Sequence, residues 1–118
     1  MDLARNILIE VEEKSKDIGI VDVVFDGYEP DVISYHIMQL NQGGLISAID
    51  CTTQFGLKWR ATGLTWEGHE FLDAIRNDTV WKSVKDTVKE KGGAVPFEIL
   101  KTLAVEAAKT FWKVVSGA

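Results

Sequence analysis

Residues 63–76 read Gly63-Leu64-Thr65-Trp66-Glu67-Gly68-His69-Glu70-Phe71-Leu72-Asp73-Ala74-Ile75-Arg76, a strand end that turns directly into a helix. Thr65 is suited to cap this helix, because its hydroxyl can accept a hydrogen bond from a backbone N–H left free at a helix start. Glu67 lies in the first turn, where the positive end of the helix dipole favours a carboxylate. The helical spacing predicts an apolar face made of Leu64, Phe71, Leu72 and Ile75. We expect this face to form the central core together with three residues of earlier helices, Ile7, Leu8 and Ile37.

The composition indicates one cytoplasmic globular domain. The chain has 118 residues, 46% hydrophobic and 26% charged, which suits a single core and not two. No apolar run approaches the roughly 20 residues that span a bilayer. The first residues become amphipathic at once, unlike a signal peptide. A single cysteine, Cys51, excludes an internal disulfide and suits a reducing compartment.

The remaining elements follow from periodicity and from breaking residues. Upstream of the central stretch we expect a helix over 3–16, a β-branched strand over 20–25, a helix from Pro30 to the Gly43-Gly44 pair, and hairpin strands over 45–50 and 58–62. Downstream, residues 77–79 cap a helix that ends at Gly92-Gly93, and Pro96 starts a last helix that runs to about residue 115.

The order helix, strand, helix, hairpin, helix is that of a winged helix. The stretch Leu64-Thr65-Trp66-Glu67-Gly68-His69-Glu70-Phe71-Leu72-Asp73-Ala74-Ile75-Arg76 resembles the signature of a small winged-helix family of unknown function, found in bacteria, prophages and phages. The resemblance extends more weakly over about residues 3–103. It implies an α+β winged helix over residues 1–76, with two extra C-terminal helices over 77–118 in the same domain. The helix that normally precedes the recognition helix is missing or reduced to a turn near Gly27-Tyr28.

The charge is divided unevenly along the chain. Residues 1–75 contain five Lys and Arg against thirteen Asp and Glu, a net charge of −8, whereas residues 76–118 contain eight against five, a net charge of +3. Most non-specific affinity for duplex DNA comes from Lys and Arg that displace counterions. The expected winged-helix part therefore has the wrong sign for an ordinary DNA-binding protein.

The expected recognition helix lacks the residues that read bases. With Ile33, Ile37 and Leu40 turned inward, its outward residues are Asp31, Ser34, Tyr35, Met38 and Gln42. Base edges are usually read by Arg, Lys, Asn or Gln, yet no Lys or Arg occurs between Asp17 and Leu57. Only Lys58 and Arg60 of the wing could reach a phosphate backbone. Tyr and Met are common at protein interfaces, so the five outward residues favour a protein partner.

Candidates for chemistry are few, and each has a simpler structural interpretation. His36 lies beside the core stripe and is better explained as a histidine with a locally satisfied ring nitrogen. His69 and Cys51 show no metal-ligand spacing with it. We therefore expect no catalytic residue, no metal and no cofactor. Trp59, Trp66 and Trp81 surround the junction of wing and helix in sequence, and we interpret them as a core cluster.

The last helix carries a broad apolar face. Its seam residues repeat at spacings of three and four: Phe97, Leu100, Ala104, Ala107, Phe111 and Val114. This spacing is typical of helix–helix packing. The face either docks on the body of the same chain or forms a homodimer with a second copy, and the spacing leads us to expect the dimer.

These observations favour a non-enzymatic interaction module that binds a protein partner. The family resemblance implies phage or prophage ancestry, so the partner is plausibly a host or defence factor. In one variant the acidic face occupies a nucleic-acid site on that partner. The alternative is a dimeric winged-helix transcriptional regulator, in which the basic C-terminal half and the wing compensate for the acidic helix.

Overall fold

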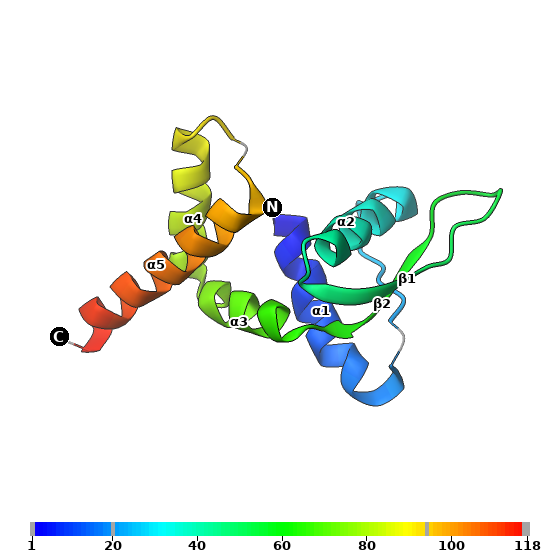
Figure 1. Cartoon of the computed structure of the whole chain (residues 1–118), viewed down its shortest axis with the longest axis horizontal. Helices are drawn as coiled ribbons and strands as arrows, with labels where there is room; N and C mark the ends of the chain where they lie inside the picture. The colour runs from blue at the N-terminus through cyan, green and yellow to red at the C-terminus, as the bar shows by residue number, and fades with distance from the viewer. Residues whose placement is uncertain (1, 20, 94, 117–118) are drawn as a thin grey trace. The chain divides into compact units, whose positions relative to one another are not determined.

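The computed structural model describes residues 2–19, 21–93 and 95–116, which divide into two compact units (Figure 1). Unit 1 comprises residues 1–69 and unit 2 comprises residues 70–118. Within the described residues the chain forms five helices and one two-stranded antiparallel hairpin, so it is an α+β protein. The boundary between the units falls inside the third helix, α3 (Trp66–Ile75).

Unit 1 holds two long helices, the hairpin and the first turn of α3. The helices are α1 (Asp2–Ile18) and α2 (Pro30–Gln42), and the strands are β1 (Ile46–Asp50) and β2 (Trp59–Leu64). Ile46 pairs with Leu64 and Asp50 with Trp59, and the register shifts between Ser47 and Ala48. We call residues 46–64 the wing. The order of these elements is consistent with a winged-helix layout.

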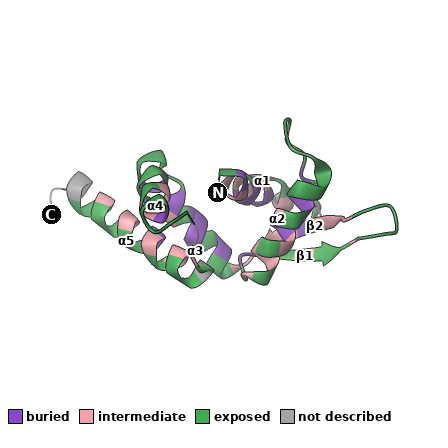
Figure 2. Ribbon diagram, turned by 90° about the horizontal axis from the view of Figure 1, so that it is seen from above, coloured by how far each residue is buried: buried purple, intermediate pink, exposed green. Residues whose placement is uncertain are grey.

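The core of unit 1 lies where α1 and α2 pack against each other and against the hairpin. Each helix turns one apolar face inward, coloured purple in Figure 2. Burying one such side chain stabilises the fold by about 1.5–3 kcal/mol relative to exposure. The buried residues of this core include Leu3, Ile7, Leu8, Val11, Ile33, Ile37, Leu45, Ile46 and Ala61. Leu64, expected in the core, is only half-buried.

The junction between the wing and α3 forms as its sequence predicts. The Thr65 hydroxyl accepts a hydrogen bond from the Gly68 backbone N–H at 3.0 Å, which is the expected N-cap. The same hydroxyl donates to the Gly44 carbonyl, and the Thr65 N–H donates to the Leu45 carbonyl at 3.0 Å. A side chain at position 68 would place its Cβ 1.9 Å from the Leu45 oxygen. Glycine is therefore required where α3 begins against the backbone of Leu45, the residue before β1.

The expected strand over residues 20–25 is not formed within the described part of the chain. One isolated bridge remains, in which the Val21 N–H donates to the Ala61 carbonyl at 2.7 Å. Ile20 lies outside the described residues. β-Branched residues favour an extended backbone, but a strand also needs a hydrogen-bonded ladder. Only Val21 supplies that pairing here.

Unit 2 contains the rest of α3, α4 (Asp78–Glu90) and α5 (Phe97–Ser116), with α5 packed along α4. Asn77 caps α4, because its side-chain oxygen accepts from the N–H groups of Thr79 at 2.8 Å and Val80 at 3.3 Å. The buried residues of this unit include Phe71, Leu72, Ile75, Val80, Trp81, Val84, Val88 and Ala104.

Candidate functional site

The exposed side of α2 is the first part of the candidate site. Pro30 begins the helix and Asp31 lies in its first turn, where the helix dipole favours a carboxylate. Tyr35 is 46% exposed, and its hydroxyl accepts a hydrogen bond from Gln39 Nε2 at 2.9 Å. Val32, one turn earlier, is 41% exposed. The expected outward residues Asp31, Tyr35 and Gln42 are all exposed.

Two of the five expected outward residues of α2 lie elsewhere. The expectation that Ser34 points outward is wrong, because this residue is buried and its hydroxyl accepts a hydrogen bond from the Trp59 N–H at 3.2 Å. Ser34 thus fastens α2 to β2, a contact across 25 residues of sequence that helical spacing does not reveal. Met38 is half-buried and offers only part of its side chain to solvent.

His36 has the local partner expected of a structural histidine. Its Nδ1 lies 2.8 Å from the Val32 carbonyl and donates to it, which fixes the proton on Nδ1. The ring meets Tyr35 edge-on, with centroids 6.2 Å apart. Among the described residues, no group of three or more His, Cys, Asp or Glu side chains could hold a metal ion.

The wing cations face a carboxylate. Lys58 Nζ lies 3.5 Å from Asp22 Oδ1, and Arg60 Nε lies 3.1 Å from the same oxygen. The Arg60 contact has ion-pair distance without the alignment of a hydrogen bond. Both cations were expected as phosphate contacts, but Asp22 was not expected beside them, since nothing local in the sequence links residue 22 to residues 58 and 60. One carboxylate therefore offsets part of the positive charge of the wing.

The tip of the wing is a closed turn that carries an exposed aromatic ring. Thr53 and Gly56 exchange backbone hydrogen bonds of 3.2 and 3.1 Å, which leaves Gln54 and Phe55 in a two-residue loop. Gly56 has a φ of 142°, a conformation that favours glycine. Phe55 is 89% exposed. The segment is the expected loop, but its exposed phenyl group was not among the expected site residues, although an aromatic residue in an uncharged turn can be recognised in the sequence.

One carboxyl group at the base of the tip is held in its charged form. Hydrogen bonds from the side chain and the backbone amide of Thr52 lower the pKa of Asp50 below its ordinary value. The amide bond to Asp50 Oδ1 measures 2.9 Å. The hairpin continues past Asp50, because the Cys51 N–H donates to the Lys58 carbonyl at 2.8 Å. The tip is thus a hydrogen-bonded extension of the β1–β2 pair.

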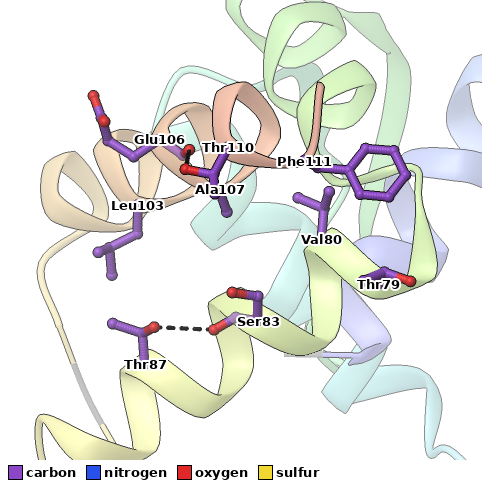
Figure 3. Close-up of a pocket in the computed structure, with 9 residues that line it drawn as sticks. All are labelled: Thr79, Val80, Ser83, Thr87, Leu103, Glu106, Ala107, Thr110 and Phe111. Atoms are coloured by element: carbon purple, nitrogen blue, oxygen red, sulfur yellow. Dashed lines mark hydrogen bonds between the residues drawn. The ribbon is translucent and has the colours of Figure 1, made fainter. Parts of the chain in front are cut away.

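The apolar face of α5 is largely turned toward α4 of the same chain. Ala104 is fully buried, while Leu100, Ala107 and Phe111 are half-buried. An open groove of about 410 Å³ runs between the two helices (Figure 3). The side chains of Phe97 and Val114, also expected in this face, lie outside the described residues. Contact with a second copy stays a prediction.

The tryptophans divide between core and surface. Trp81 is buried, and Trp59 is half-buried. The expectation that Trp66 joins a core cluster is wrong, because Trp66 is 78% exposed. It precedes Gly68 by two residues, a rotation of about 200° around the helix, and Gly68 occupies the side that meets Leu45. Trp112 is also exposed.

No helix within the described ranges is long and apolar enough to cross a membrane.

Comparison with known proteins gives two matches and one negative result. Residues 1–94 match the family described as hypothetical protein, DUF2513. An uncharacterised protein from Haemophilus influenzae is 41% identical over 104 residues, which cover 87% of this chain and 88% of that protein. No solved structure matches the chain. The chain therefore belongs to the DUF2513 family.

Proposed function

We propose that this chain is a non-enzymatic interaction module with a winged-helix fold, which binds another protein through the exposed side of α2. The observation that carries the proposal is the ion-pair cluster on the wing. Lys58 and Arg60 are the cations expected to contact phosphate, and both lie against Asp22. A wing that binds DNA needs cations directed at the phosphates. In this chain the two wing cations already face the carboxylate of Asp22.

The exposed side of α2 has the composition of a protein contact. Val32 and Tyr35 are three residues apart, so they are neighbours on the helix surface. Tyr35 supplies a rigid apolar ring with a polar tip, a type of residue enriched at interfaces. Glu29 and Asp31 add exposed negative charge at the start of the helix. This surface would complement a partner that is basic and has an apolar recess.

The resemblance to a prophage and phage family gives this proposal a setting. A small phage-borne protein that binds a host or defence factor would need such a surface and no catalytic group. If the partner is itself a nucleic-acid-binding protein, the acidic side of unit 1 would occupy the partner's nucleic-acid site. That variant is supported by the net charge of −6 over unit 1, residues 1–69, which contain five Lys and Arg against eleven Asp and Glu.

A DNA-binding dimeric regulator is the second candidate. One observation favours it: the side chains of Lys58 and Arg60 are each 42% exposed, so a strong polyanion could compete with Asp22 for them. The two candidates predict opposite results in a duplex titration.

We expect the chain to bind duplex DNA weakly or not at all. The test is fluorescence anisotropy of labelled duplexes in about 0.1 M salt, where contact charges remain effective. The duplexes should include the DNA upstream of the gene itself, because a regulator commonly binds there. A specific site with a Kd near 10⁻⁸ M, about the affinity of an operator, would overturn the protein-binding proposal in favour of the regulator.

A matched pair of variants tests the protein contact. The immobilised full chain is incubated with bacterial host lysate, beside Tyr35→Ala and Trp112→Ala, which truncate exposed aromatic residues in unit 1 and unit 2. We expect a retained protein that Tyr35→Ala loses and Trp112→Ala keeps. Retention that is equal on all three chains would contradict the assignment of the surface to α2.

A further inference from the structure

We propose that Phe55 at the tip of the wing is an anchor that enters an apolar pocket on the protein partner. This gives the partner a second point of contact beside the exposed side of α2, and it rests on the proposed function.

The ring is presented to solvent by its own unit. Phe55 is 89% exposed, the largest exposure of any large apolar residue in the described part of the chain. Figure 1 shows the loop between β1 and β2 extending away from α1 and α2, and Figure 2 shows its tip as exposed. A ring in this position contributes almost nothing to the core of unit 1. Its removal should therefore leave folding unchanged, which makes its role testable by substitution.

The backbone of the loop around Phe55 is ordered before any partner arrives. The reciprocal Thr53 and Gly56 backbone bonds close the turn, and the Phe55 N–H donates to Thr53 Oγ1 at 3.1 Å. Below them, the Lys58 N–H donates to Thr52 Oγ1 at 3.2 Å. Ordering a loop on binding weakens affinity, and a loop that is already ordered avoids this loss. The hydrogen bonds suit Phe55 to act as an anchor.

The absence of charge around the tip favours a pocket on a protein as the site that Phe55 enters. Residues 51–57 read Cys51-Thr52-Thr53-Gln54-Phe55-Gly56-Leu57 and carry no charge, so the tip can be desolvated without burying an ion. Side chains that insert between DNA bases or into an anionic membrane surface are commonly accompanied by several cations. The nearest cations, Lys58 and Arg60, face Asp22. A buried aromatic anchor in a fitted pocket is instead the usual centre of a protein interface.

The first experiment locates the tip in the complex. The photo-crosslinking residue p-benzoylphenylalanine replaces Phe55, Tyr35 or Val24 in the full chain, and each variant is irradiated in host cells. Val24 is the control because it is 78% exposed in the same unit and outside both proposed contacts. We expect positions 55 and 35 to crosslink to the same polypeptide and position 24 to give no such product.

The second experiment measures the contribution of the ring. The polypeptide crosslinked from position 35 is purified, and its affinity is measured for the wild-type chain, Phe55→Ala, Phe55→Leu and Gln54→Ala. We expect Phe55→Ala to raise the Kd by about tenfold or more, as truncation of an aromatic anchor does. Phe55→Leu should recover part of that loss, and Gln54→Ala should change little. All four chains should keep the same thermal midpoint.

The outcomes separate this inference from the proposed function. If position 35 crosslinks a protein that Phe55→Ala binds as well as the wild type does, the anchor is overturned and the proposed function stands. If no position crosslinks a protein, both are overturned. Binding of the wild-type chain, lost in Phe55→Ala, to phosphatidylglycerol vesicles or to a random-sequence duplex would replace the protein pocket with a membrane or a nucleic acid.

Discussion

At the scale of single residues, Gly68 decides how close α3 approaches the wing. Its α-carbon faces the Leu45 carbonyl so closely that a Cβ atom would lie 1.9 Å from the oxygen and 2.9 Å from the carbonyl carbon. Both atoms belong to the backbone, so no rotamer change can relieve the contact. Alanine at this position must push α3 away from Leu45 and weaken the Thr65 hydrogen bonds to Gly44 and Leu45.

Gly68→Ala is therefore expected to lower the free energy of unfolding by about 3 kcal/mol or more. Gly63→Ala is the matched control, because position 63 has an ordinary φ and nothing within 4 Å of its Cβ position. That variant should be neutral or slightly stabilising. Urea unfolding monitored by circular dichroism measures both, and equal midpoints would contradict the close approach of α3 and β1.

Residue-level expectations hold where the determining contact is local. The Thr65 cap and the Asn77 cap each depend on N–H groups two or three residues away, which the sequence places next to them. Ser34 and Trp66 fail for the opposite reason. The partner of Ser34 is the Trp59 N–H, and the direction of Trp66 depends on Leu45 lying against Gly68. The helical spacing of the sequence predicts neither of these long-range contacts.

At the scale of elements, the wing combines a tip without charge and a base where Asp22 offsets part of the positive charge. Asp22 belongs to a segment that the sequence analysis expects to be a full strand, although only Val21 of the described residues pairs with β2. The carboxylate reaches Lys58 and Arg60 beside that bridge. Local propensity does not predict contacts between residues far apart in the sequence. The hairpin is therefore predictable from the sequence, but the ion pairs that Asp22 makes with it are not.

Asp22→Asn should raise the affinity of the chain for duplex DNA several-fold, because it removes the carboxylate that faces both wing cations. The salt dependence should also steepen, by about 0.9 in log K against log salt for each cation that reaches a phosphate. Asp26→Asn is the control, since it changes the net charge equally at an exposed position in the next turn. Anisotropy titrations at several salt concentrations measure both variants, and an equal gain would show that only net charge matters.

At the scale of the whole molecule, the two compact units differ in net charge. The acidic residues concentrate in the region that contains unit 1, and the basic excess lies beyond residue 75. Unit 2 depends on α5 for part of its core, because Ala104 is fully buried while α5 packs on α4. The family match ends at residue 94, before α5 begins. The apolar seam of α5 was visible in the sequence, but its partner within the chain was not.

Ala104→Glu should undock α5, because it forces a charge into a fully buried position at a cost of several kcal/mol. Val105→Glu introduces the same charge one residue later, where the side chain is 44% exposed, and should be tolerated. Hydrogen exchange resolved by peptide measures the effect. We expect faster exchange in α4 and α5 of Ala104→Glu only, and protection equal to that of the wild type would show that α5 is not held through Ala104.

The contacts of Thr65 and Gly68 with Gly44 and Leu45 also bear on protein synthesis. During translation β1 emerges before residues 65–68, which hold Gly44 and Leu45, the two residues before β1, in place. At about 5–20 residues per second, the stretch from Leu45 to Gly68 takes about one to five seconds to make. During that interval the nascent hairpin lacks the contacts made by Thr65 and Gly68, and chaperones can bind its apolar strand residues. The rate of translation while this segment emerges therefore sets how long the newborn chain stays exposed.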